Sequence, residues 1–267
     1  MPELPEVELF RRVAAGCVGR VIARATIHDP DSIAGPSPAT VKRRLKGAGI
    51  RGAARHGKHL LLDLDAAGCL AMHFGMNGSL ARVAAEALDP PYTRLGLVLD
   101  GGERLDYLNP RRLGKVELAK DAATFIAAAG LGPDALDPRF DRPALAAIVA
   151  GRKRDIKSIL MDQALVAGIG NLYSDEILFQ ARIHPQHRGD TLDGPQIGQL
   201  HGSIGRVLKA AIAWGAGSEQ NLDRLPNDFL LRERRRDGHC PRCGAALATL
   251  KHGGRTAYYC PRCQPEP

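Results

Sequence analysis

The chain has 267 residues, a mass of 28.6 kDa, 44% hydrophobic residues and a formal net charge of +8 at pH 7. This length predicts two or three folded domains. The lack of an apolar leader or a bilayer-length apolar run argues against secreted and membrane classes, so we expect a cytoplasmic protein.

The first ten residues, MPELPEVELF, predict a helix that begins near Pro5, because proline is favoured in a first helical turn. The three glutamates of this stretch would complement the positive end of the helix dipole. Neither argument explains why a second proline, Pro2, directly follows the initiator methionine.

Residues 18–118 predict an all-β domain, either a sandwich or a barrel. Short alternating or apolar runs such as RVIARATIHD, HLLLDLDAAG and RLGLVLDGGERLDYL are separated by turn residues, and DAAG and DGG are typical of hairpin turns. Cys17 and Cys69 stand alone in apolar surroundings, and we expect buried small side chains there rather than nucleophiles.

From residue 121 the spacing of apolar residues becomes helical, which predicts a helical domain over about 131–220. Within it, the sequence AGIGN precedes a helix that opens at Asn171. Backbone N–H groups at such a helix N-terminus suit a phosphate, and Asn171 would add a side-chain donor. A tight corner between two helices, which also needs glycine, is the alternative. Residues 216–236 predict a mobile connector with one short ordered piece.

The last thirty residues, 238–267, are too few to bury a core without help. Two CPRC sequences are separated by sixteen residues that predict a hairpin, and they supply Cys240, Cys243, Cys260 and Cys263. Four thiolates at this spacing close a tetrahedral zinc site with no open position, so the metal would be structural and would stabilise the segment. A redox disulfide pair is disfavoured in a reducing compartment.

Four stretches of the chain are rich in lysine and arginine: VKRRLKG, NPRRLGK, GRKRDIK and LRERRR, at 41–47, 109–115, 151–157 and 231–236. Separated basic patches favour a polyanion partner, most often nucleic acid, with a solvated basic surface as the alternative. Aromatic residues make up only 4% of the chain, which favours contacts to a nucleic-acid backbone over stacking on single-stranded bases.

Six motifs occur in order along nearly the whole chain: MPELPEVE, GKHLLLDL, MHFGMNGSL, NPRRLGK, LMDQALVAGIGNLYSDEILFQARIHP and KHGGRTAYYCPRC. Together they resemble the bacterial formamidopyrimidine-DNA glycosylase family, which includes endonuclease VIII. The resemblance implies a multidomain α+β chain. Its parts would be an N-terminal β-sandwich with a leading helix (1–120), a helix–two-turns–helix domain (131–222) and a four-cysteine zinc finger (236–267).

The resemblance also implies a role for Pro2. Removal of Met1 would free a secondary amine, which the family uses to attack C1′ of a damaged nucleotide, giving a Schiff base and then β,δ-elimination. An α-amino group, with a pKa of about 7.7–8.0, is partly neutral at pH 7, whereas a lysine at about 10.4 would need a large shift. By the same resemblance Glu3 is the general acid/base that assists sugar-ring opening, and Glu6 supports the site.

Further residues match positions at which family members hold DNA around an extruded nucleotide. Lys58 and Arg255 match residues that contact phosphate and assist elimination. Met76, Arg111 and Leu113 match the residues that fill the gap left in the duplex. The remaining expected DNA contacts are His73, Tyr92, Arg152 and Asn171.

The chain departs from the family pattern at three places. Leu113 stands where members specific for oxidised purines usually have phenylalanine, Tyr92 begins a YTR that replaces a histidine-containing pattern, and residues 216–236 replace a glycine- and threonine-rich stretch that closes over the base. We expect a monomer with one zinc ion that acts on damaged double-stranded DNA, with oxidised purines such as 8-oxoguanine and formamidopyrimidines favoured. Oxidised pyrimidines, abasic sites and a non-catalytic damaged-DNA-binding role are the alternatives.

Overall fold

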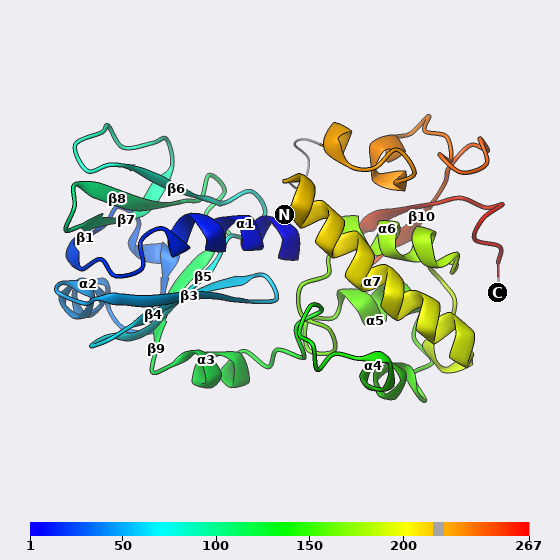
Figure 1. Cartoon of the computed structure of the whole chain (residues 1–267), viewed down its shortest axis with the longest axis horizontal. Coiled ribbons are helices and arrows are strands. Elements are labelled where there is room, and N and C mark those ends of the chain that lie inside the picture. The colour runs from blue at the N-terminus through cyan, green and yellow to red at the C-terminus, as the bar shows by residue number, and fades with distance from the viewer. Residues whose placement is uncertain (216–221, 267) are drawn as a thin grey trace. The chain divides into compact units, whose positions relative to one another are not determined.

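The computed structural model describes residues 1–215 and 222–266, and the chain divides into two compact units. The first unit comprises Met1–Pro2 and Glu6–Gly130, and the second comprises Glu3–Pro5 and Leu131–Pro267. Figure 1 shows the strands of two sheets in the first and mostly helices in the second. The helical region and the cysteine-rich segment fall into one unit, and the three domain boundaries expected from the resemblance stay a prediction.

The first unit is a β-sandwich, as predicted. One sheet has the strand order β1-β7-β8-β6 and the other β2-β9-β5-β4-β3. All neighbouring strands are antiparallel except β2 and β9. The bounds are β1 (Ile22–Ile27), β2 (Ile33–Ala34), β3 (Ile50–His56), β4 (His59–Leu64), β5 (Gly68–His73), β6 (Ser79–Ala84), β7 (Thr93–Leu99), β8 (Glu103–Leu108) and β9 (Lys115–Ala119).

A single apolar core fills the space between these sheets. It contains Leu62 of β4 and Leu97 of β7, one from each sheet, and both are fully buried. The turns DAAG and DGG join β4 to β5 and β7 to β8, as the sequence predicted. Cys17 and Cys69 are buried, which confirms the expectation for these two thiols.

Helices of the first unit are α1 (Leu4–Ala15, whose first two residues are assigned to the second unit), α2 (Pro38–Leu45), α3 (Ala122–Ala128) and the 3₁₀ turn Pro30–Ser32. The expectation of an all-β stretch over 18–118 was wrong at α2. The Ser37 side chain accepts a hydrogen bond from the Thr40 amide, and Pro38 occupies the first helical turn. Both are helix-start signals, and they outweigh the turn character of this segment.

The second unit contains α4 (Arg142–Val149), α5 (Ile156–Met161), α6 (Asn171–Ala181) and α7 (Gly194–Trp214), with a 3₁₀ turn at Gly189–Thr191. Helix α6 opens at Asn171 as predicted, is buried from Tyr173 to Ala181, and packs against α7. No helix among residues 1–215 and 222–266 is both long enough and apolar enough to cross a bilayer.

The connector differs from its prediction. Its residues 216–221 lie outside the described residues. The described remainder has two ordered pieces rather than one, the 3₁₀ helices Leu222–Arg224 and Leu230–Glu233. Buried Leu225, Phe229 and Leu231 join the apolar core of the helical unit, which explains why this part is ordered.

The cysteine-rich segment forms the predicted hairpin of β10 (Ala248–His252) and β11 (Arg255–Tyr259). Gly253 and Gly254 make its turn with φ of 52° and 74°, the left-handed region that favours glycine. A small apolar cluster beside the hairpin contains Phe179, Leu230, Cys240, Leu247 and Cys260.

Candidate functional site

The carboxylate of Glu3 caps the N-terminus of α6. It accepts hydrogen bonds from the amides of Gly170 (2.6 Å), Leu172 (2.9 Å) and Tyr173 (3.3 Å), and the residue is only 3% exposed. An anion at this position satisfies otherwise unpaired amides and interacts favourably with the helix dipole. A Cβ on Gly170 would lie 2.4 Å from the Glu3 carboxyl carbon, so only glycine permits this approach.

This cap corrects one interpretation of the AGIGN turn. The turn suited a phosphate, with a tight corner between two helices as the alternative, but in the structure three amides at the start of α6 donate to Glu3. The side-chain amide of Asn171 is also engaged, because its Nδ2 donates to the carbonyl oxygen of Thr256 in β11 at 3.2 Å. Its Oδ1 is buried and has no hydrogen-bond partner among the described residues.

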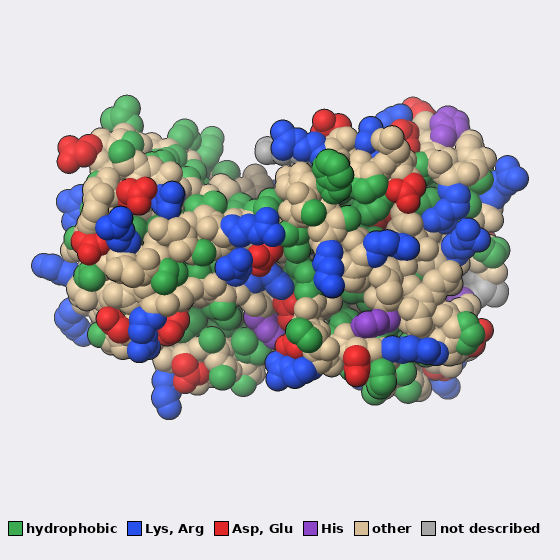
Figure 2. Space-filling view, in the orientation of Figure 1, with side chains coloured by type: hydrophobic (Ala, Val, Ile, Leu, Met, Phe, Trp, Pro, Cys, Tyr) green, Lys and Arg blue, Asp and Glu red, His purple; other side chains and the backbone are tan. Residues whose placement is uncertain are grey.

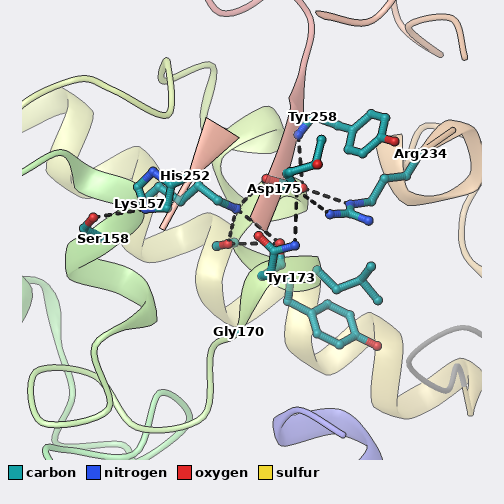
Figure 3. A network of polar contacts seen from close by, with 12 residues as sticks. Lys157, Ser158, Gly170, Tyr173, Asp175, Arg234, His252 and Tyr258 are labelled. Atoms are coloured by element: carbon teal, nitrogen blue, oxygen red, sulfur yellow. Dashed lines mark hydrogen bonds and ion pairs between the residues drawn. The ribbon is translucent and has the colours of Figure 1, made fainter. Parts of the chain in front are cut away.

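A second carboxylate, that of Asp175, organises a buried network next to this cap (Figure 3). Its Oδ1 lies 2.6 Å from Nζ of Lys157, and neither side chain is exposed. Its Oδ2 accepts from Nε of Arg234 at 2.9 Å and from the amide of Tyr258 at 3.2 Å. Burial lowers the pKa of Lys157, although the charge of Asp175 acts in the opposite direction.

Sequence reasoning missed this network. Lys157 was counted in the basic stretch GRKRDIK and Arg234 in LRERRR, as parts of basic surface patches. In the structure Lys157 is fully buried and the side chain of Arg234 is only 16% exposed. Charge counting carries no information on burial, and the partner Asp175 lies in a different segment of the sequence.

Arg255 opens β11 beside the hairpin turn and pairs in register with His252. Its side chain is exposed, and it makes no hydrogen bond or ion pair within the part of the chain that the structure describes. His252 is held in place, since its Nε2 lies 3.0 Å from Ser158 Oγ and 3.6 Å from Asp155 Oδ1. The hairpin therefore presents, on an anchored turn, a guanidinium that has no hydrogen-bond or ion-pair partner among residues 1–215 and 222–266.

The four cysteines fit a zinc ion. One Sγ from each of Cys240, Cys243, Cys260 and Cys263 forms a group in which all four atoms lie within 4.8 Å of one another. The pairs Cys240–Cys263 and Cys243–Cys260 are 3.8 and 3.5 Å apart. Tetrahedral zinc with bonds of about 2.3 Å places its sulfurs about 3.8 Å apart.

In the first unit, Pro2, Glu6 and Lys58 are buried. The nitrogen of Pro2 is in the peptide bond to Met1 in this chain. Lys58 lies in the turn between β3 and β4, and burial together with its positive charge lowers the pKa of His73. The Gly75 amide donates to Nδ1 of His73 at 3.3 Å. The neutral ring therefore carries its hydrogen on Nε2, which makes that atom a donor.

Three large apolar side chains of this unit are exposed on neighbouring loops: Met76 (43%), Tyr92 (58%) and Leu113 (51%). Buried Asn109 joins these loops. Its Nδ2 donates to the carbonyl oxygen of Phe74 at 3.3 Å, and its backbone N–H donates to the carbonyl oxygen of Tyr92 at 3.0 Å.

Glycines also bring two of these loops together, since a Cβ on Gly75 would lie 2.6 Å from the backbone of Leu113. Arg111 is exposed on the same loop as Leu113. Of the other expected DNA contacts, Arg152 is half-buried, and its Nη1 donates to the carbonyl of Ile148 at the end of α4. In this structure that side chain is used within its own unit.

Three family models match the chain. The formamidopyrimidine-DNA glycosylase N-terminal domain matches residues 1–116, the formamidopyrimidine-DNA glycosylase H2TH domain matches residues 131–223, and a zinc finger found in FPG and IleRS matches residues 239–265.

Full-length relatives and solved structures agree with these matches. The formamidopyrimidine-DNA glycosylase of Moorella thermoacetica is 42% identical over 260 residues, covering 94% of this chain and 95% of that protein. That of Geobacter metallireducens is 36% identical over 269 residues, covering 99% and 100%.

A crystal structure of a Lactococcus lactis FPG mutant with a Fapy-dG containing DNA aligns with a TM-score of 0.89 and 30% identity, covering 99% of this chain and 100% of that one. A structure of MutM in complex with carbocyclic 8-oxo-G containing DNA aligns with a TM-score of 0.88, at the same identity and coverage.

Proposed function

As the chain belongs to the formamidopyrimidine-DNA glycosylase family, we propose that it is a bifunctional DNA glycosylase and AP lyase whose nucleophile is Pro2. Its enzyme class, a DNA glycosylase of base excision repair, follows from family membership over the whole chain. The observation that supports Pro2 as nucleophile and Glu3 as acid/base is the position of Glu3 at the N-terminus of α6. The carboxylate next to Pro2 in sequence is held by three backbone amides, so it is preorganised for proton transfer at the sugar.

In the proposed reaction the neutral Pro2 nitrogen bonds to C1′ as the bond from C1′ to the base breaks, and the base takes up a proton as it leaves. The nitrogen passes its own proton to the Glu3 carboxylate, and its lone pair then opens the C1′–O4′ bond while Glu3 gives that proton to O4′. The resulting iminium acidifies C2′. Loss of that proton expels the 3′ phosphate, loss of the C4′ proton expels the 5′ phosphate, and water releases Pro2.

Cationic and donor groups would hold the strand during these steps. The Nε2–H of His73 is oriented as a donor by the Gly75 amide, and Lys58 supplies a positive charge close to it. Arg255 offers an exposed guanidinium with no partner in the described part of the chain. We assign phosphate contacts to these three residues, with Arg255 assisting the second elimination. Glu6 supports the site, and Arg152 and Asn171 are further proposed DNA contacts.

Met76, Arg111 and Leu113 are proposed to enter the duplex and fill the gap behind the extruded nucleotide, and Tyr92 is proposed as a further DNA contact. Their exposure on joined loops supports this role, because large apolar side chains that stay in water commonly mark a binding surface. We favour oxidised purines as substrates, since solved relatives are bound to Fapy-dG and 8-oxo-G containing DNA. Oxidised pyrimidines and abasic sites are the second candidates, because Leu113 is aliphatic.

The proposed partner is damaged double-stranded DNA, bound by a monomer that carries one structural zinc ion. Figure 2 shows lysine and arginine side chains over the visible surface of both units, in keeping with a net charge of +8 and a polyanion partner. We place the enzyme on the bacterial nucleoid, where its DNA would be.

Borohydride trapping tests the nucleophile. Protein whose Met1 has been removed is incubated with a duplex that contains 8-oxoguanine or an abasic site, and borohydride reduces the Schiff base to a stable adduct. We expect one covalent adduct per enzyme, and Pro2→Gly is expected to abolish it. Processed protein that binds the duplex without ever forming an adduct would instead support a non-catalytic damaged-DNA-binding role.

A further inference from the structure

We infer that Asp175 is a positioning residue that holds Arg255 for elimination, acting through Arg234 and the backbone of β11. The inference rests on the proposed role of Arg255. It adds two residues, Asp175 and Arg234, neither of which would touch the DNA.

The carbonyl next to Arg255 is fixed by two donors. Thr256 O accepts from Nδ2 of Asn171 at 3.2 Å and from Nη2 of Arg234 at 3.0 Å. Two residues further along β11, the amide of Tyr258 donates to Asp175 Oδ2 at 3.2 Å. Alternate residues of a strand direct their backbone groups to the same edge, so Thr256 O and Tyr258 N lie on the edge of β11 that β10 does not pair. Side chains complete that edge in place of another strand.

Asp175 also holds the arginine that fixes Thr256. Nε of Arg234 donates to Asp175 Oδ2 at 2.9 Å while Nη2 reaches Thr256 O, and the guanidinium carbon lies 4.7 Å from the centre of the Tyr258 ring. One planar guanidinium is thereby fixed by a carboxylate, a carbonyl and an aromatic ring (Figure 3).

Charge makes the carboxylate essential to this arrangement. Lys157 and Arg234 both approach Asp175, and the charge of Arg234 contributes to lowering the pKa of Lys157. An amide at position 175 would leave two cations beside each other with a single acceptor oxygen between them. Removing one partner of a buried ion pair destabilises a protein by more than the pair's net contribution to stability suggests. Here Arg234 would shift, and Thr256 would lose the hydrogen bond that Arg234 donates to its carbonyl oxygen.

Arg255 depends on this support because it has no side-chain partner of its own among the described residues. Its guanidinium is located by the backbone at Thr256 and by the turn that His252 anchors through Ser158 at 3.0 Å. A small shift of β11 therefore moves the guanidinium directly.

The test measures how the strand is cut, which does not depend on the fraction of folded enzyme. Met1-processed native protein, Asp175→Asn, Arg234→Gln and Arg255→Gln are given a duplex with a preformed abasic site, and the products of β-elimination alone and of β,δ-elimination are separated. We expect all three variants to raise the ratio of β-only to β,δ product relative to native by about tenfold or more, since a shift of about 1 Å at a catalytic group is costly. Zinc content should stay at one per chain.

Coupling and a matched control complete the design. Asp175→Asn combined with Arg255→Gln should raise the β-only share no further than Arg255→Gln alone, because the two residues act in one path. Asp190→Asn removes an exposed ion pair with Arg188 in the same unit and should leave the product ratio native.

Two results would overturn the inference in distinguishable ways. A native product ratio in zinc-loaded Asp175→Asn and Arg234→Gln, with an altered ratio in Arg255→Gln, rejects the positioning role alone. A native ratio in Arg255→Gln rejects the proposed role of Arg255, and the positioning role with it. Should Asp175→Asn fail to fold, Arg234→Gln decides, since that side chain lies nearer the surface.

Discussion

Gly170 has no side chain at the point where the Glu3 carboxylate meets α6, and a Cβ there would lie 2.4 Å from the carboxyl carbon. We therefore expect Gly170→Ala to displace Glu3. Base release should fall by about a hundredfold, because a shift of about 1 Å at a catalytic group can cost that much. Single-turnover kinetics on a duplex with 8-oxoguanine measure this, alongside zinc content and circular dichroism, which should stay native.

Gly202 of α7 supplies the matched control, since a Cβ there meets no described atom within 4 Å. Gly202→Ala should leave base release unchanged and raise stability by up to about 1 kcal/mol, because alanine is the better helix former. If Gly170→Ala releases base as fast as Gly202→Ala, base release does not depend on the hydrogen bonds between Glu3 and the N-terminus of α6.

The same contact shows where prediction from sequence stopped. The turn AGIGN indicated an anion at the start of α6, and the resemblance singled out Glu3, but these were two separate expectations. In the structure the anion on those amides is the carboxylate of Glu3. More than 160 residues separate the partners, and no local pattern joins positions so far apart.

The β10–β11 hairpin depends on its metal, because the apolar cluster beside it is small and includes two of the four cysteines. We expect Cys243→Ser to release zinc and unfold the hairpin, since a structural zinc site contributes on the order of 10 kcal/mol. Arg255 would then no longer be held by the hairpin, so DNA affinity and strand cleavage should fall together. Metal analysis, a gel-shift titration and an abasic-site cleavage assay on the same sample measure the three quantities.

Cys69→Ala is the companion variant, because Cys69 is buried in the β-sandwich and lies outside the group of four thiols. It should keep one zinc per chain and cleave DNA normally. Complete zinc loss from Cys243→Ser with native cleavage would separate the metal from the positioning of Arg255.

Most secondary structure was predictable, because apolar periodicity and turn residues are local signals. The sandwich strands, the helix opening at Asn171 and the cysteine hairpin followed from such patterns. Helix α2 was missed, since the charged stretch around it resembles a surface loop until Ser37 and Pro38 are weighed as a helix start. The burial of Lys157 could not be predicted, because it follows from tertiary contact with Asp175.

Stability of the whole chain should depend on pH through Glu176. This fully buried residue accepts hydrogen bonds from Gln180 Nε2 at 2.8 Å and from the Leu231 amide at 2.9 Å, and burial raises its pKa to about 7. The folded state therefore binds a proton more tightly than the unfolded state, whose pKa is 4.5. The free energy of unfolding should fall as pH rises from about 4.5 to 7, by about 3 kcal/mol from this group.

Glu176→Gln removes the titration while keeping a side chain that accepts a hydrogen bond. Urea unfolding of zinc-loaded native and variant protein at pH 5.5 and 8 gives the comparison across the upper part of this interval, in which most of the loss occurs. We expect the native protein to lose more stability than the variant between these pH values. An equal loss in both would assign the pH dependence to other groups.

The order of the parts was also predictable from the order of the motifs, which the family models follow from residue 1 to residue 265. The contribution of the connector was not. Residues 222–236 resembled a loop, yet Leu231 and Arg234 bond to buried carboxylates on α6. Such contacts depend on the folded path of the chain.

The position of Glu3 at the N-terminus of α6 has a practical consequence for producing this enzyme. Glu3 is fixed and its neighbour in sequence, Pro2, is buried. The N-terminus is therefore a poor place for a purification tag. Because we propose Pro2 as the nucleophile, we expect a fusion there to keep its nitrogen in an amide bond and to prevent formation of the Schiff base. A tag is better placed at the C-terminus, after Gln264, whose Nε2 donates a hydrogen bond to the carbonyl oxygen of Ile183.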